Sequence, residues 1–419
     1  MTGPHLVIVG GGFAGLTVAR DLRHAPIKIT LIDRSNHHLF QPLLYQVATA
    51  GLSPANIATP IRAILSGQKN VEIMMTEVTG VDTKNHLVLT QDRAIQYTQL
   101  VLATGSTYHF FGHDHWEPYT RGLKTLVDAT AIRRKILLSF EKAEVETNPA
   151  RKKFLLTFVL VGGGPTGVEM AGSIAELAHQ ALKSDFHHID PKMLRIVLIE
   201  AGDRILATFP ESLALRATQR LQAMGVEIQT CTRVQDINAE GVRWGDTRID
   251  ANTVIWTAGV VASPAGKWLG AQLDPLGRVR VNPDLTLPGH PEIFVIGDTA
   301  CVHQDEKPLP GVAPVAMQQG TYVAKVIIRR LRGKLKPRPF RYLNKGNLAT
   351  VGRSFAIADL GSFRIAGAFA WLTWLVVHIY YLIGFKNRLL VLIEWAWAYF
   401  TFQRGARLIP EGENSKNTD

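Results

Sequence analysis

The chain has 419 residues, 46% of them hydrophobic, and its 46 Lys and Arg exceed its 35 Asp and Glu by a formal charge of +11. This length is too great for one hydrophobic core, so we expect two or three domains. The two cysteines, Cys231 and Cys301, form no CxxC pair, which argues against a disulfide scaffold and a dithiol redox site. A strand begins almost at the first residue, so we expect no signal peptide and a reducing, cytoplasmic setting.

The stretch from residue 6 to residue 33 predicts a dinucleotide-binding unit. The apolar run LVIV predicts a buried parallel strand, and the motif GGGFAG, a helical pattern and a second strand follow it. In this motif Gly10 allows the tight turn, Gly12 lets the backbone approach a pyrophosphate, and Gly15 lets helix and strand pack closely. Asp33, at the end of the second strand, is placed to accept hydrogen bonds from a ribose.

The same pattern recurs in the middle of the chain, where FVLV leads into GGGPTG, a helix and a strand that is followed by Glu200. Gly162, Gly164 and Gly167 take the places of the three motif glycines. A carboxylate at Glu200 pairs with a ribose 2′-hydroxyl and repels a 2′-phosphate, so we expect NADH rather than NADPH. The nearby Arg204 leaves a small opening for NADPH.

Two later strands support a duplication of this unit. One is followed by Thr104 and Gly105, and the other leads to Gly259. Gly162 lies 152 residues after Gly10, and Gly259 lies 154 residues after Gly105. Two copies in register predict an α/β fold with two dinucleotide-binding, Rossmann-type domains.

From residue 279 the chain is expected to return to the first domain. A strand is followed by Gly297 and Asp298, and PGVAPVAMQQG then opens a helix in which Pro314 suits the first turn. The positive end of that helix is suited to stabilise an anion, such as the pyrimidine end of a reduced flavin. We expect a first domain at residues 1–115 and 279–345, a second at 116–278, and a C-terminal membrane-associating region at 346–419.

Local patterns between these motifs give further expectations. Strands near residues 71–75 and 87–89 predict a small β-meander, residues 122–140 predict a loop and then a helix, and residues 145–153 predict a linker. His37 and His38 are expected in a solvated turn.

The positive charge is concentrated near the end of the chain. From residue 329 to residue 407 there are 14 Lys and Arg against only Asp359 and Glu394. Such a basic segment indicates an anionic partner, either a membrane or a nucleic acid. The apolar run at residues 366–385 favours a membrane surface with anionic lipid and argues against nucleic acid.

The run at residues 366–385 is long enough to span a bilayer, but it is rich in Trp and Tyr, bracketed by basic residues and followed by a run too short to span. These features are typical of helices that lie among lipid headgroups, and we favour that arrangement over a spanning helix. A helix buried in a dimer core is a third alternative, and the choice between monomer and homodimer stays open. His378 is expected to be an interfacial residue rather than a proton donor.

With these motifs assembled, the chain resembles the type II NADH dehydrogenases, which are single-subunit, FAD-containing NADH:quinone oxidoreductases. The resemblance covers residues 6–409 and rests on VGGGFAG, FQPLLYQVA, LVLATGS, VGGGPTGVEMAG, VIWTAGV, FVIGDTA, APVAMQQG and the basic, Trp-rich tail. It implies that the first fold holds FAD, that the second binds NADH as substrate, and that C-terminal amphipathic helices attach the enzyme to the cytoplasmic face of the cell membrane as a peripheral protein. No residue suited to covalent flavin attachment is evident, so we expect non-covalent FAD.

The resemblance also implies three sets of site residues. Those for FAD are Gly10, Gly12, Gly15, Asp33, Gln41, Gln46, Thr104, Gly105, Gly297, Asp298, Ala316 and Met317, and those for NADH are Gly162, Gly164, Gly167, Glu200 and Gly259. Those on the quinone side are Tyr45, Pro314, Gln318 and Gln319, with Gln318 and Glu169 as catalytic residues. Pro314 departs from the family pattern, in which many members have Gln and a polar contact to the quinone head.

Glu169 has a second interpretation of equal weight. An acid in the first turn of a helix interacts favourably with the helix dipole without any catalytic role. In the resembling family this glutamate lies near the contact between nicotinamide and flavin. Cys301 is expected to be a packing residue, and no metal site is predicted.

The expected reaction is hydride transfer from NADH to FAD and then transfer of two electrons to a membrane quinone of the ubiquinone, menaquinone or plastoquinone type. No proton pumping is expected, because the sequence contains no bundle of polar spanning helices. A sulfide:quinone oxidoreductase is a weaker alternative, because it needs a reactive cysteine pair beside the flavin. An NADH-binding redox sensor is an alternative from another class of protein. Steady NADH oxidation with a soluble quinone distinguishes the NADH:quinone oxidoreductase from such a sensor.

Overall fold

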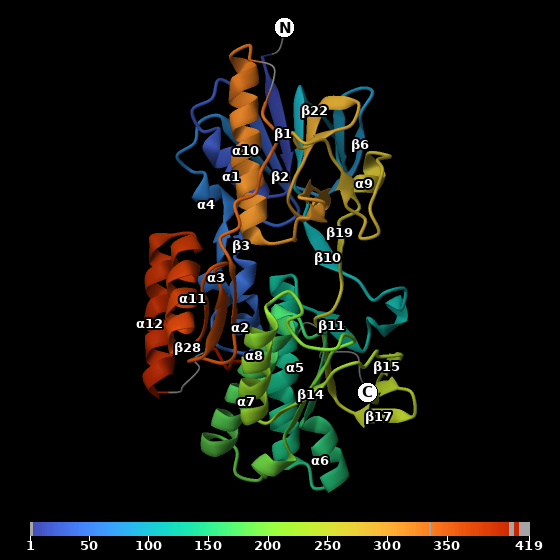
Figure 1. Ribbon diagram of the computed structural model, residues 1–419, viewed down its shortest axis with the longest axis vertical. Coiled ribbons are helices and arrows are strands. Elements are labelled where there is room, and N and C mark those ends of the chain that lie inside the picture. The colour runs from blue at the N-terminus through green and yellow to red at the C-terminus, as the bar shows by residue number, and fades with distance from the viewer. Residues whose placement is uncertain (1–2, 335–336, 402–405, 410–419) are drawn as a thin grey trace. The chain divides into compact units, whose positions relative to one another are not determined.

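The structure, a computed structural model, describes residues 3–334, 337–401 and 406–409, and for residues 180–184 and 400 it describes the backbone alone. The chain divides into two compact units, whose elements are labelled in Figure 1. Unit 1 comprises Met1–Leu39, Ala58–Thr107 and Val260–Lys345, and unit 2 comprises Phe40–Ile57, Tyr108–Gly259 and Gly346–Asp419.

Unit 1 is built on a six-stranded sheet with the strand order β21-β22-β9-β1-β2-β5. β1 runs parallel to both neighbours, so that Val7 lies beside Thr30 on one side and beside Leu100 on the other. The apolar run of β1 is buried on both faces, as is usual where helices cover a parallel sheet. The strands are β1 (His5–Val9), β2 (Lys28–Asp33), β5 (Val71–Met75), β9 (Gln99–Leu102), β21 (Thr286–Leu287) and β22 (His290–Val295).

Two helices of unit 1, α1 (Phe13–Asp21) and α10 (Ala313–Leu331), pack against each other beside this sheet (Figure 1). They approach closely at Gly320, where a side chain would lie 2.6 Å from the carbonyl oxygen of Ala14. The smaller elements are β3 (His37–Leu39), β4 (Ala58–Pro60), α4 (Ile61–Ile64), β10 (Ser106–Tyr108), β19 (Val260–Ala262), α9 (Ala265–Trp268), β20 (Val279–Arg280), η4 (Gly297–Thr299), β23 (Ala300–Cys301), β24 (His303–Gln304) and β25 (Lys307–Pro308).

The expected β-meander is present, but its membership differs from the expectation. It consists of β6 (Val78–Asp82), β7 (Leu87–Thr90) and β8 (Ala94–Gln96) in antiparallel register. Residues 71–75 instead form β5, an edge strand of the main sheet, where Val71 lies beside Ile29 of β2 in parallel register.

Unit 2 contains a five-stranded sheet with the order β11-β18-β12-β13-β14, in which β12 lies between β13 and β18 just as β1 lies between β2 and β9 in unit 1. Every registered pair in this sheet is parallel. The duplicated Rossmann-type fold expected from the sequence is therefore confirmed. The strands are β11 (Thr120–Gly122), β12 (Thr157–Val161), β13 (Arg195–Ile199), β14 (Val226–Gln229) and β18 (Thr253–Trp256), with a separate antiparallel sheet of β15 (Asp236–Asn238), β16 (Gly241–Trp244) and β17 (Thr247–Asp250).

The helices of unit 2 include one that the sequence did not predict. Residues 145–153 were expected to form a linker, but Asn148 caps a helix there by accepting hydrogen bonds from the backbone N–H groups of Ala150 and Arg151. The helices are η1 (Gln41–Leu43), α2 (Leu44–Ala48), α3 (Pro54–Ile57), η2 (Asp114–Trp116), α5 (Leu126–Val145), α6 (Pro149–Leu155), α7 (Pro165–Ser184), η3 (Pro191–Met193) and α8 (Glu211–Ala223).

The C-terminal part of the chain packs within unit 2. It contains the antiparallel sheet β26 (Asn347–Thr350), β27 (Ala356–Asp359) and β28 (Arg364–Gly367), followed by α11 (Ala368–Tyr381) and α12 (Phe385–Thr401). β26 packs on α7 and β27 packs on α8, which ties this part to the second nucleotide-binding fold.

One segment packs in a different compact unit from the domain in which we expected it. Residues 40–57 belong to unit 2, because α2 packs against α5 and α7, whereas we expected them in the first domain. The expected C-terminal region at 346–419 packs with unit 2, and its status as a region of its own stays a prediction; residues 402–405 and 410–419 lie outside the described part of the chain.

Across the described ranges, the structure contains no helix that combines the length and the apolar character needed to cross a membrane. Residues 366 and 367 of the long apolar run end strand β28, and α11 then has 14 residues.

Candidate active site

The first fingerprint loop has the backbone geometry that a pyrophosphate site requires. Gly10 has a φ of +106°, and a Cβ at this position would collide with the carbonyl oxygen of Ala103. A Cβ on Gly15 would collide with the carbonyl oxygen of Gly10, whereas one on Gly12 would meet no heavy atom within 4 Å. The loop is therefore closed where helix and strand meet and open at Gly12, as expected for a dinucleotide phosphate.

The Asp33 carboxylate binds backbone N–H groups in and near this loop. One oxygen accepts the backbone N–H of Gly11 at 2.6 Å, and the other accepts that of Ser35 at 2.7 Å. Each carboxylate oxygen retains a further lone pair, so Asp33 can still accept a ribose hydroxyl.

His38 is a residue of this site that the sequence interpretation placed wrongly. Instead of lying in a solvated turn, its side chain is only 2% exposed, and its ring meets Phe13 edge-on at 4.9 Å. Its Nδ1 lies 3.1 Å from the carbonyl oxygen of Gly11, and because a carbonyl only accepts, Nδ1–H is the donor. Burial lowers the pKa of His38 to about 4, so the imidazole is neutral at pH 7. The only feature of the sequence that could have indicated a place for His38 in this site is its position shortly after Asp33. The neighbouring His37 bonds Asn36 near the surface.

The second fingerprint in unit 2 repeats the arrangement. Gly162 has a φ of +116°, a Cβ on Gly167 would collide with the carbonyl oxygen of Gly162, and Gly164 is open. Glu200 accepts the backbone N–H of Gly163 at 2.6 Å. The second oxygen of Glu200 accepts the N–H of Gly202 at 2.7 Å.

The turn that ends at Gly259 closes the same site. Gly259 has a φ of +64°, which favours glycine, and a Cβ there would collide with the ring of Phe111. The structure therefore brings the expected NADH residues of the loop together with Glu200, which directly follows β13, in unit 2.

The remaining expected FAD residues of unit 1 lie at the ends of β9 and β22 and at the start of α10. Asp298 accepts a hydrogen bond from the hydroxyl of Ser106 at 2.7 Å. The Thr104 hydroxyl is bonded to those of Ser263 and Thr299, and Gly105 has a φ of +70°.

The glutamines at the start of α10 have their amide groups occupied within unit 1. Gln319 is buried, and its Oε1 accepts the N–H of Gly297 at 2.6 Å. Gln318 both donates to and accepts from the backbone of Leu343 at 2.9 Å. Their expected place on the quinone side stays a prediction, and in this structure they also hold Gly297 and the segment around Leu343 in place.

The start of α10 itself agrees with the expectation. Pro314 lies in the first turn, Ala316 and Met317 follow it, and the N-cap residue Val312 provides no side-chain cap. The positive end of the helix therefore remains available to an anion.

Tyr45 and Gln46 of α2, and Gln41 before it, lie in unit 2. The Gln41 amide donates to the carbonyl of Lys124. The Tyr45 hydroxyl lies 3.0 Å from Thr350 Oγ1, and the Gln46 amide donates to Tyr45 at 3.0 Å. Burial raises the pKa of Tyr45 well above its ordinary value, and the charge of Glu169 adds to this effect.

Glu169 lies beyond the first turn of α7, which begins at Pro165, so the helix-dipole interpretation does not describe it. Desolvation raises the pKa of its carboxyl to about 8, although the backbone N–H of Thr350 donates to Oε1 at 3.4 Å and opposes this effect. The structure therefore places beside Tyr45 a carboxyl that is largely protonated at pH 7.

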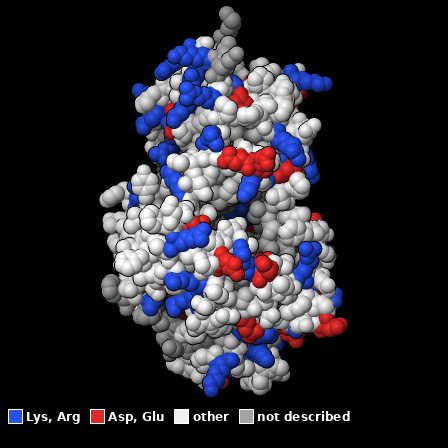
Figure 2. Space-filling view, in the orientation of Figure 1, with Lys and Arg blue, Asp and Glu red and all other residues white. Residues whose placement is uncertain are grey.

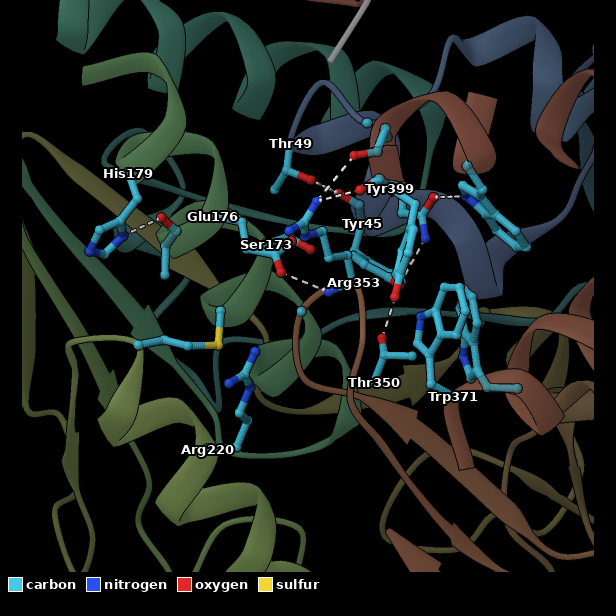
Figure 3. A pocket seen from close by; sticks show the side chains of 18 of the residues that line it. Tyr45, Thr49, Ser173, Glu176, His179, Arg220, Thr350, Arg353, Trp371 and Tyr399 are labelled. Atoms are coloured by element: carbon cyan, nitrogen blue, oxygen red, sulfur yellow. Dashed lines mark hydrogen bonds between the residues drawn. The ribbon is translucent and has the colours of Figure 1, made fainter. Parts of the chain in front are cut away.

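A pocket of about 390 Å³ lies in unit 2 next to these residues (Figure 3). One wall is aromatic and comes from α11 and α12, and the opposite wall is polar and comes from α7 and α8. It is lined by Tyr45, Gln46, Thr49, Gly51, Ser173, Ala175, Glu176, His179, Arg220, Ala223, Met224, Thr350, Gly352, Arg353, Trp371, Trp374, Trp395, Ala398 and Tyr399.

The tryptophans of the tail were expected in the membrane headgroup region, yet three of them, Trp371, Trp374 and Trp395, line this pocket. Trp374 is only 2% exposed, because its ring stacks on His378 at 4.2 Å and packs against Trp395 at 5.1 Å. His378 was expected to be an interfacial residue, but its ring packs on Trp374 and its Nδ1 donates to the Trp374 carbonyl at 2.7 Å. Burial lowers the pKa of His378 to about 4, so it is neutral at pH 7, and its lack of a proton-donor role stays a prediction.

Cys301 is buried, and desolvation raises the pKa of its thiol, as suits a packing residue. In the ranges that the structure describes, no group of three or more His, Cys, Asp or Glu residues is placed to hold a metal ion.

Comparisons with known proteins agree with this geometry. The pyridine nucleotide-disulphide oxidoreductase family matches residues 4–320, and the NDH2 C-terminal domain matches residues 344–404. The type II NADH:quinone oxidoreductase Ndh of Mycobacterium tuberculosis is 42% identical over 97% of this chain and 90% of its own length. NdhA of the same organism is 41% identical over 96% and 89%.

Among solved structures, NDH2 from Plasmodium falciparum in complex with NADH matches with a TM-score of 0.89 over 98% of this chain and all of that chain. At 20% identity this likeness shows the fold alone. The family matches and the mycobacterial relatives span nearly the whole chain, and they show the family in addition to the fold. The chain belongs to the pyridine nucleotide-disulphide oxidoreductase family and, within it, to the type II NADH:quinone oxidoreductases.

Proposed function

We propose that this enzyme oxidises NADH and reduces a membrane quinone of the ubiquinone, menaquinone or plastoquinone type, without pumping protons. The observation that carries the proposal is the paired fingerprint: in each unit an acid bonds the second glycine of an open phosphate loop, at Asp33–Gly11 and at Glu200–Gly163. Two such loops in one chain suit an enzyme that holds a flavin dinucleotide and binds a nicotinamide dinucleotide.

The residues of unit 1 fit FAD. Gly10, Gly12 and Gly15 leave room for its pyrophosphate, and Asp33 would bond a ribose. Asp298 and the positive end of α10 would lie toward its other half. When bound, FAD takes up the hydride of NADH and passes two electrons to the quinone.

The residues of unit 2 fit NADH. Gly162, Gly164 and Gly167 form the phosphate loop, and Glu200 would bond the 2′-hydroxyl of the adenosine ribose. Backbone N–H groups bind both carboxylate oxygens of Glu200 and hold the side chain in one position. The carboxylate therefore cannot move to avoid repulsion with the 2′-phosphate of NADPH. Glu200 therefore selects NADH over NADPH.

The quinone is proposed to bind in the aromatic pocket of unit 2. Its volume of about 390 Å³ suits a quinone ring, and Trp371, Trp374 and Trp395 offer flat apolar contacts. Tyr45 and Gln46, which line the pocket, come from the segment that resembles the flavin-side loop of the family.

Glu169 is proposed to supply a proton during quinone reduction. Its carboxyl holds a proton below about pH 8 and is linked through the backbone of Thr350 to the pocket wall. An acid with a pKa close to the working pH can both release and regain a proton.

The outer faces of α11 and α12 are proposed to bind the cytoplasmic face of the membrane. Figure 2 shows few charged side chains over these helices in that view. Arg364 and Lys386, which are both exposed, flank α11 and suit anionic lipid. The exposed apolar side chains include Phe369, Leu372, Val376, Tyr380, Phe385, Leu389 and Ile393.

The proposal is tested with the purified, yellow holoenzyme. NADH should bleach the flavin under anaerobic conditions, and added short-chain ubiquinone and menaquinone analogues should sustain steady NADH oxidation. A redox sensor would show the bleaching without turnover, and that result would refute the enzymatic function. Use of sulfide instead of NADH as reductant would favour the sulfide:quinone oxidoreductase alternative.

A further inference from the structure

A continuous set of hydrogen bonds connects helix α12 with the polar end of the pocket in unit 2. The Trp395 indole N–H donates to Gln46 Oε1 at 2.7 Å. Gln46 Nε2 donates to the Tyr45 hydroxyl oxygen at 3.0 Å, and that hydroxyl lies 3.0 Å from Thr350 Oγ1. The backbone N–H of Thr350 in turn reaches Glu169. Trp395, Gln46, Tyr45 and Thr350 all line the pocket.

The indole determines the direction of the first two bonds in this set. An indole nitrogen can only donate, so the group of Gln46 that faces Trp395 must be the carbonyl oxygen. The amide NH₂ of Gln46 is then directed at Tyr45, whose oxygen accepts. In the last hydroxyl pair, either Tyr45 or Thr350 can be the donor. A flipped Gln46 amide would set two N–H donors against each other at Trp395 and is therefore disfavoured.

We propose that Trp395 is a positioning residue for quinone reduction, which fixes the Gln46 amide and through it the Tyr45 hydroxyl in the pocket. This inference rests on the proposed function of the pocket. In this proposal α12 orients side chains in the pocket through Trp395, in addition to the proposed membrane contact of its outer face. The donor and acceptor pattern that the quinone meets then depends on the seating of α12 against α2.

The indole also packs against Trp374, so loss of the ring and loss of the N–H must be separated. Trp395→Phe retains a six-membered aromatic ring and removes the N–H donor together with the five-membered ring of the indole, so the double-mutant cycle below is needed to isolate the loss of the hydrogen bond. The matched control is Trp397→Phe on the same helix, because Trp397 is 60% exposed and its indole has no hydrogen bond among the described residues.

The first measurement uses detergent-purified holoenzyme with a short-chain, water-soluble quinone. Trp395→Phe should lower kcat/KM for the quinone about tenfold, as expected for one misdirected hydrogen bond, mainly through KM. Flavin bleaching by NADH in stopped flow should stay at the wild-type rate, and Trp397→Phe should match wild type in both assays. A Trp395→Phe enzyme with wild-type quinone kinetics would overturn the inference.

A double-mutant cycle supplies a readout that a merely structural role would not produce. Gln46→Leu removes the residue through which Trp395 acts, so Trp395→Phe should cost little more in that background, and the two losses should be strongly non-additive. Additive losses would mean that Trp395 acts on its own and would overturn the inference. The wild type separates the two proposals: an absence of quinone turnover there refutes the proposed function, whereas normal turnover with an additive cycle refutes only the role of Trp395.

Discussion

The carboxylate of Glu200 accepts the backbone N–H of Gly163 at 2.6 Å, and the same relationship joins Asp33 to Gly11 in the other unit. The two loops differ in the donor that binds the carbonyl oxygen of Gly163 or Gly11. Gly163 receives the backbone N–H of Leu206 at 2.8 Å, whereas Gly11 receives the imidazole of His38. A side chain thus does in unit 1 what the main chain does in unit 2.

Replacing Asp33 with Ala should weaken FAD binding. The change removes the bonds to Gly11 and Ser35 together with the proposed ribose contact, and a charged hydrogen bond contributes about 1.5–3 kcal/mol. We expect the FAD Kd of the reconstituted apoprotein to rise at least about tenfold, measured by flavin fluorescence quenching. Full flavin retention through gel filtration would show that Asp33 is not the ribose ligand.

His38→Phe should also weaken FAD binding, by leaving the Gly11 carbonyl without its side-chain donor. His37→Phe, at the neighbouring and more exposed position, is the matched control and should bind FAD like wild type. The pKa of His38 is lowered to about 4, so between pH 6.5 and pH 4 the unfolded state binds more protons and stability falls as pH falls. His38→Phe should reduce this acid-side loss in thermal melts, and an unchanged slope would contradict the assignment.

Glu200→Gln should narrow the preference for NADH over NADPH. The wild-type ratio of kcat/KM for the two nucleotides is expected to be on the order of a hundredfold, because charge repulsion and a lost hydrogen bond act together. The amide removes the repulsion, but its single oxygen can accept only one of the two N–H groups, of Gly163 and Gly202, that the carboxylate binds. Binding of both nucleotides should therefore weaken while the ratio between them narrows. Comparable kcat/KM for NADH and NADPH in the wild type would remove Glu200 from this role.

Glu169→Gln should change how stability and quinone turnover depend on pH. Because the pKa of Glu169 is raised to about 8 from an ordinary 4.5, the folded state binds more protons between these values, and stability falls as pH rises through that window. The wild-type Tm should therefore fall more steeply from pH 6 to pH 9 than that of Glu169→Gln. Quinone turnover by the variant should be reduced, with NADH-dependent flavin bleaching retained. Glu77→Gln, at an exposed position outside the helices, serves as the control for a charge change alone.

Changing Phe369, Leu372 and Tyr380 to Ser should release the enzyme from vesicles that contain anionic lipid. These side chains are 82%, 53% and 69% exposed, and burial of each in the interface contributes on the order of 1 kcal/mol or more. High salt alone should release the wild type only partly, because it screens basic residues but not apolar contacts. A matched triple variant at exposed Val127, Val145 and Leu215 should pellet like wild type. Equal pelleting of both variants would place the membrane contact elsewhere.

The sequence by itself determined the features that depend on local chemistry. The order of strand, glycine turn, helix and acid, met twice in register, specified both nucleotide folds, because each glycine is required by its own backbone contact and each acid by the N–H groups beside it. The roles of Cys301 and Pro314 followed from the same local reasoning.

Only the tertiary structure decided where distant segments meet. The pKa of Glu169 depends on desolvation by residues far from it in the chain, and no spacing rule predicts that Trp395 bonds Gln46. The apolar residues of the tail predict helices that each bury one face, but they do not show which face of each helix is buried. Packing of α11 against β26 and β27, and of α12 against α3, directs Trp374 and Trp395 into the pocket and leaves Phe369 and Tyr380 outside, because side-chain burial is set by the partner surface and not by residue type.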